Sequence, residues 1–133
     1  MSEHKKELIN HYTWQLTYLN GHEMKNYDFT DRKLENIPHL KMNTDKTFVL
    51  GSTGCNRLSG AFNFSESEER FHLVFTPLAV TKKFCPDTPY EQDFLKLLHE
   101  TEYVTIDLND LTMSFKNKNG EVTMTFSILE EVS

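Results

Sequence analysis

Two cysteines and six histidines are the side chains that could carry nucleophilic or metal-binding chemistry. A protein zinc site usually takes three or four ligands, often from closely spaced pairs. The histidines form no His-x3-His pair, and none lies beside a cysteine. They are His4, His11, His22, His39, His72 and His99. We therefore predict no metal site, and no other motif indicates a cofactor.

The cysteines, Cys55 and Cys85, allow three interpretations. A nucleophilic pair would join one of them to a histidine, but no local signature supports such a pair. A disulfide would tie the turn after Gly54 to the residue before Pro86, and closing that loop would stabilise the fold by about 3–4 kcal/mol. Two buried free thiols would instead act as small hydrophobic side chains. The sequence leaves the last two open and predicts no catalytic residue, with a thiol-dependent enzyme using Cys55 or Cys85 as a remote alternative.

Charge and hydropathy argue against a nucleic-acid partner and against a transmembrane segment. The net charge is −6, from 20 acidic and 14 basic side chains. Nucleic-acid binding depends largely on neutralising phosphates, so this balance argues against DNA or RNA. No apolar run approaches the ~20 residues that span a bilayer. We expect neither a nucleic-acid partner nor a transmembrane segment.

Most of the chain alternates apolar and polar residues, the pattern of half-buried strands. Residues 1–11 are polar, and we expect them to be disordered. A charged stretch at 22–37 reads as a long surface loop. Four phenylalanines in a predicted hairpin are expected to lie mainly in the core: Phe62, Phe64, Phe71 and Phe75. The predicted strands cover 12–18, 40–43, 47–51, 61–64, 71–75, 104–108, 111–115 and 122–128.

One helix is expected, at about residues 89–101. Thr88 would be its N-cap, Pro89 its first residue, and Glu91 would complete a capping box with Thr88. Phe94, Leu98 and their neighbours then share one face at helical spacing. Strands with one apolar face and a single helix predict an α+β fold, either a strongly twisted antiparallel sheet or a partly open, cracked barrel.

Two motifs in order along the chain resemble the signatures of the META domain, or HslJ-like, family. The run from Gly54 through Cys55, Asn56 and Arg57 to Gly60 matches the first, G-C-N-x-x-x-G. Thr81 and Cys85 match the second, T-x3-C. The resemblance extends over about residues 12–129, and we assign 12–130 to one domain of this kind.

The resemblance implies a cracked antiparallel barrel with one helix, and no established enzymatic activity. Relatives in this family are mostly bacterial, often envelope lipoproteins or secreted proteins with links to stress. An envelope location is therefore expected, with an export signal absent from this chain; a cytoplasmic location is the alternative. The motif residues are structural candidates first.

A non-enzymatic, monomeric binding domain is the leading functional hypothesis. Its partner would be an apolar small molecule or a protein segment, bound in a cleft that the helix leaves in the barrel. The alternative is a structural or chaperone-like domain that acts through an exposed strand edge without a small-molecule ligand.

Overall fold

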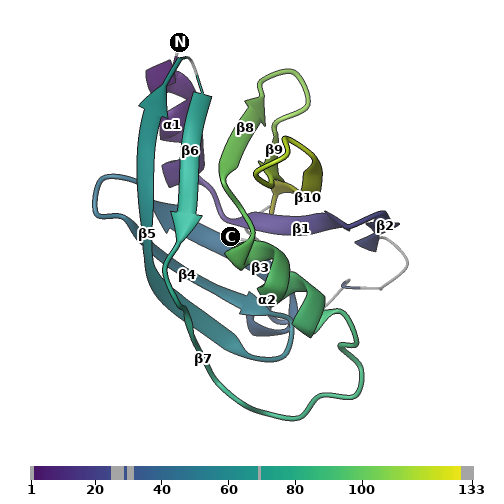
Figure 1. The fold of residues 1–133 in the computed structure, drawn as a ribbon. Coiled ribbons are helices and arrows are strands. Elements are labelled where there is room, and N and C mark those ends of the chain that lie inside the picture. Colours follow the sequence, from purple (N-terminus) through teal and green to yellow (C-terminus); the bar gives the residue numbers. More distant parts are fainter. Residues whose placement is uncertain (1, 25–28, 30–31, 69, 130–133) are drawn as a thin grey trace.

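A computed structural model describes residues 2–24, 29, 32–68 and 70–129. Eight strands form a closed antiparallel barrel in the order β1-β3-β4-β5-β6-β8-β9-β10, which the pairing of β10 with β1 completes. Short strands β2 and β7 pair with β1 and β5 (Figure 1). The strands are β1 Trp14–Leu19, β2 His22–Glu23, β3 Pro38–Asn43, β4 Phe48–Thr53, β5 Arg57–Ser67, β6 Arg70–Phe75, β7 Ala79–Val80, β8 Tyr103–Asp107, β9 Thr112–Lys116 and β10 Val122–Ile128.

Two seams in this barrel are short. Strand β1 meets β3 only at Trp14↔Leu40 and its neighbouring pair. Strand β6 meets β8 only at Phe71↔Val104 and its neighbouring pair. The barrel therefore closes around its circumference but is weakly joined at two places, which confirms the predicted α+β fold with a barrel-like sheet.

Large side chains fill the barrel interior. Five fully buried rings lie there, with aliphatic and methionine side chains between them. They are Trp14, Phe62, Phe94, Phe115 and Phe126. Phe62, Phe71 and Phe75 belong to this core, as predicted, and Phe64 packs against it. Side chains in interiors of this kind pack about as densely as organic crystals, so these rings form the hydrophobic core of the protein.

The first helix, α1 (Ser2–His11), corrects the prediction of a disordered N-terminal segment. Ile9 is 1% exposed and joins the core, although most of the helix is polar. Asn10 anchors the end of α1, because its side chain donates to Thr44 Oγ1 and accepts from the Thr44 amide. A short polar helix has little stability alone, so these tertiary contacts hold it in place.

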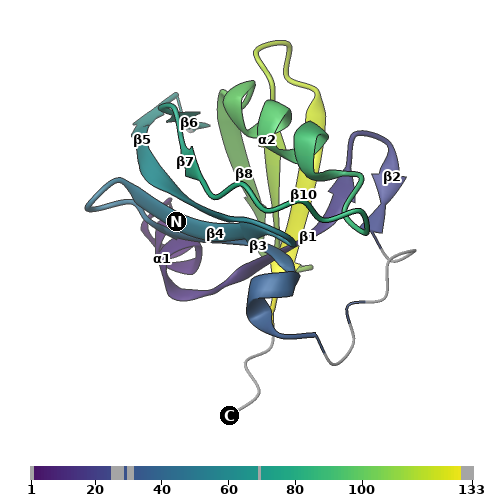
Figure 2. The same cartoon turned by 90° about the horizontal axis from the view of Figure 1, so that it is seen from below.

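The second helix, α2 (Glu91–His99), is the predicted one, but its start differs. Its N-cap is Tyr90, and the Thr88 hydroxyl donates to the Cys85 carbonyl, 3.0 Å away. The capping-box prediction is therefore wrong. Phe94 and Leu98 face the core, as their spacing indicated. Figures 1 and 2 show α1 and α2 on different sides of the barrel.

The stretch predicted as a loop at 22–37 contains β2 and a short 3-10 helix, η2 (Leu34–Asn36), beside β4. Residues 25–28, 30 and 31 lie outside the described part. Within the described residues, no helix has the length and apolar character needed to cross a membrane.

Candidate functional site

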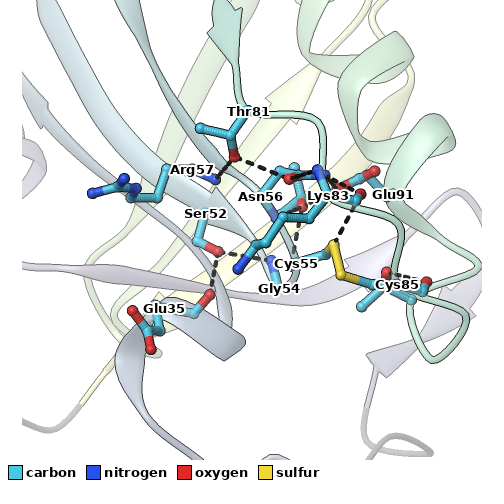
Figure 3. Close-up of a disulfide and its surroundings, with 12 residues drawn as sticks. Glu35, Ser52, Gly54, Cys55, Asn56, Arg57, Thr81, Lys83, Cys85 and Glu91 are labelled. Atoms are coloured by element: carbon cyan, nitrogen blue, oxygen red, sulfur yellow. Dashed lines mark hydrogen bonds between the residues drawn. A yellow bond between two sulfur atoms is a disulfide. The ribbon is translucent and has the colours of Figure 1, made fainter.

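The residues of the two sequence motifs meet where β4 turns into β5. Cys55 and Cys85 form a disulfide, with their Cα atoms 6.0 Å apart (Figure 3). Of the three interpretations of the cysteines, the structure shows the bridge. It joins the turn between β4 and β5 to the segment before α2, here called the strap (residues 81–90). A thiol nucleophile would require this bond to be reduced first.

Asn56 is the centre of a hydrogen-bond network beside the disulfide. Asn56 is 2% exposed, and both polar atoms of its side chain are hydrogen-bonded within the protein. Its Oδ1 accepts from the Lys83 amide at 2.7 Å and from the Thr81 hydroxyl at 2.9 Å. Its Nδ2 donates to the Lys83 carbonyl at 3.1 Å and to Glu91 at 2.9 Å. One side chain thus fixes both the strap and the start of α2.

Glu91 receives a second hydrogen bond, from the Thr53 hydroxyl. Thr53 is fully buried, and its own oxygen accepts from the amides of Cys55 and Asn56. The carboxylate of Glu91 is therefore used in tertiary contacts, which explains why it does not cap its own helix. Buried polar groups in such a network are costly to leave unpaired.

Two motif glycines serve close packing. Gly54 has φ +97, a conformation that favours glycine, and a Cβ there would lie 2.5 Å from the Tyr90 hydroxyl oxygen. A Cβ at Gly60 would meet the Leu78 side chain at 2.8 Å. Both glycines allow the chain that follows β6 to lie close against β4 and β5.

Thr81 and Arg57 join the strap to β5. The Arg57 amide donates to the Thr81 hydroxyl at 3.0 Å, and the Thr81 amide donates to the Arg57 carbonyl at 3.0 Å. The Arg57 side chain takes no part in the network and points away from it (Figure 3). Among the described residues, no carboxylate pairs with it.

A groove of about 1000 Å³ lies on the outside of the barrel next to this network. Strands β3, β4 and β5 contribute residues to it, with η2 and the preceding Lys33 at one side and β7 with Thr81 at the other. Leu34 and Leu50 are 49% and 52% exposed in it. Its lining comprises Lys33, Leu34, Glu35, His39, Leu50, Gly51, Ser52, Arg57, Leu58, Ser59, Ala79, Val80 and Thr81.

Both walls of the groove are pinned by hydrogen bonds. Ser52 Oγ donates to the Glu35 carbonyl at 2.7 Å and accepts from the Gly54 amide at 2.9 Å, which holds η2 against the end of β4. At the other side, β7 pairs with β5, and the Thr81 hydroxyl donates to Asn56 Oδ1. The motif residues therefore support the groove, and Arg57 and Thr81 also line it.

His39 is the titratable group in the groove with a shifted pKa. It is 8% exposed, and burial lowers its pKa from 6.5. The hydrogen bond between its Nδ1 and the Ile37 carbonyl, 2.7 Å, opposes that shift because it favours the protonated ring. Burial is the larger effect, so His39 is held neutral at pH 7.

Sequence reasoning missed the groove and the role of Glu91. Leu34 stands among polar residues, whereas Leu50 follows Phe48 and Val49 in a predicted strand; the two come from separate segments, so no local pattern connects them. Thr53 precedes the G-C-N motif, and its partner Glu91 matched a capping box instead. In the described part of the chain, no three His, Cys, Asp or Glu side chains form a cluster suited to a metal.

These features define a class of protein: a closed, filled antiparallel barrel whose turn between β4 and β5 is bridged by a disulfide to the segment before a helix. The META domain family model matches residues 6–127, and the chain belongs to this family. A solved structure with a similar fold is described as an NMR structure of the protein from Burkholderia xenovorans. The TM-score is 0.64 at 20% identity, over 96% of this chain and 88% of the other. A search of curated proteins found no match.

Proposed function

We propose that this META domain is a non-enzymatic binding domain that holds an extended segment of a protein partner in the outer groove. The observation that carries the proposal is the pair of half-exposed leucines, Leu34 and Leu50, in a groove whose two walls are pinned. Apolar side chains exposed in a concave, preorganised surface are typical of interaction sites.

The packed barrel interior and the open groove favour a protein segment as the ligand over an apolar small molecule. Small-molecule sites usually bury most of the ligand surface in an enclosed cavity. Here the interior is occupied by rings such as Trp14 and Phe126, and the groove leaves Leu50 52% exposed. An open groove of this kind suits an extended chain that lies along the surface.

We propose that the domain works in an oxidising compartment, such as the bacterial envelope or the extracellular space. The Cys55–Cys85 disulfide supports this location, because such bonds persist mainly outside the reducing cytosol. Alkylating the protein's thiols in intact cells before lysis tests this part. A protein with both cysteines protected from alkylation fits an oxidising compartment, whereas full labelling contradicts it.

Selection of binders from a phage-displayed library of random linear peptides tests the binding role. Leu50→Ser removes the apolar floor and should abolish recovery of enriched peptides. Phe48→Ser is the matched control, since Phe48 is a 44% exposed residue on the same strand outside the groove lining. Enrichment that survives Leu50→Ser, or that fails equally in both variants, contradicts the groove as the binding site.

A further inference from the structure

The groove has a charge asymmetry that specifies its occupant more closely. Lys33 directly precedes η2 and Glu35 lies within it, and the two residues carry opposite charges. Arg57 lies on β5, and its exposed side chain has no ion-pair partner among the described residues. Among the described residues that line the groove, one cation is thus left without an opposite charge, on a protein whose net charge is −6.

The backbone of Arg57 is held by hydrogen bonds, whereas its side chain has no ion-pair partner in the part of the chain that the structure describes. Its amide and its carbonyl both bond to Thr81, and its neighbour Asn56 is buried in the network. A guanidinium on such an anchored strand end can meet a carboxylate in a bidentate geometry. Leu50 lies on the adjacent strand β4, beside Ser59 of β5, so an apolar contact and a cationic contact are close together.

We infer that the groove recognises an acidic segment of a protein partner, with a carboxylate against Arg57 and an apolar side chain against Leu50 and Leu34. This inference rests on the proposed function, because it specifies the segment bound at the same groove. The carboxylate supplies charge complementarity and orientation, whereas the apolar contact supplies buried area.

The test repeats the random-peptide selection on three charge variants. The wild-type protein should enrich peptides that combine Asp or Glu with Leu, Ile, Val or Phe. Arg57→Glu should replace the acidic preference by a preference for Lys or Arg. Arg57→Gln should weaken a selected acidic peptide by about tenfold in Kd, the usual loss for one charge-assisted hydrogen-bonded contact.

Lys118→Glu is the matched control. Lys118 is an exposed cation in the turn between β9 and β10, and it does not line the groove. It should leave both the acidic preference and the Kd unchanged. An acidic preference that Lys118→Glu removes as strongly as Arg57→Glu would reflect the general field of the protein and would overturn the inference.

Two further outcomes show whether this inference fails alone or together with the proposed function. Peptides that depend on Leu50 but show no acidic preference would overturn the role of Arg57 and leave the groove as a binding site. A fatty acid could also supply both a carboxylate and an apolar chain, and dodecanoate is the probe for that ligand. Leu50-dependent binding of dodecanoate without any enriched peptide would overturn a protein segment as the occupant.

Discussion

The side-chain amide of Asn56 donates to the carboxylate of Glu91 at 2.9 Å and so connects the turn before β5 to the first residue of α2. The same amide group reaches the Lys83 carbonyl, while its oxygen holds Thr81 and the Lys83 amide. One buried side chain therefore positions the strap and the start of α2, and Thr81 at the start of the strap lines the groove.

Replacing Asn56 by alanine should lower the free energy of unfolding by about 2–4 kcal/mol, because it leaves several buried polar groups without partners. Urea denaturation measures the change. Asn63→Ala is the control: Asn63 is exposed on the same strand, and its loss should change stability by less than about 0.5 kcal/mol. Equal effects of the two substitutions would show that the network contributes nothing specific.

The disulfide should stabilise the fold by about 3–4 kcal/mol, since it closes a loop with a sequence separation of 30. Denaturation of the wild-type protein with and without reductant measures this contribution. Cys85→Ser should unfold at the same denaturant concentration with or without reductant, close to the reduced wild-type protein. Identical curves for oxidised and reduced wild-type protein would contradict the prediction.

Protonation of His39 should destabilise the folded protein at mildly acidic pH. Burial lowers the folded-state pKa below 6.5, so the unfolded chain takes up the proton first as the pH falls. The stability contributed by neutral His39 is therefore complete above pH 6.5 and is lost as the pH falls from 6.5 through the folded-state pKa.

The unfolding free energy of wild-type protein and His39→Gln, measured across this range, tests the sign. The wild-type protein should lose stability on acidification, and His39→Gln should lose less. His22→Gln is a control at an exposed histidine and should follow the wild-type curve. An NMR titration of His39 with a midpoint above 6.5 would contradict the prediction.

Helix α1 should be coupled to the core through Ile9. The indole Nε1 of Trp14 donates to the Ile9 carbonyl at 3.2 Å, and the Ile9 side chain is 1% exposed. Ile9→Ala should cost about 2–5 kcal/mol. Trp14 is the sole tryptophan, so its fluorescence follows the unfolding transition directly. Glu7→Ala, at an exposed position on α1, is the control and should leave the unfolding transition unchanged. An unchanged transition in Ile9→Ala would show that α1 is not packed on the core.

Alternation along the chain was sufficient to predict the C-terminal strands β8, β9 and β10, because each has one buried and one solvated face. The spacing of Phe94 and Leu98 likewise predicted α2. These signals are local and depend on burial alone. These signals were also sufficient to predict the fold class, because few architectures combine strands that have one apolar face with a single helix.

The errors arose where tertiary contacts outweighed local pattern. Helix α1 has a mostly polar sequence and is held by the burial of Ile9 and by Asn10, neither of which a short window reveals. Glu91 matched a capping box, but the buried Thr53 and Asn56 compete for its carboxylate. The groove combines Leu34, Leu50 and Val80 from separate segments, and only the folded barrel brings them together.

Binding of a protein segment in the groove can be located by chemical-shift mapping on isotope-labelled protein that is titrated with a peptide from the library selection. The largest shifts should lie around the groove, at Leu34, Leu50, Ser59 and Val80, and Leu50→Ser should remove them. Shifts centred instead on the outer face of β8, β9 and β10, with the groove residues unchanged, would show that the peptide does not bind in the groove.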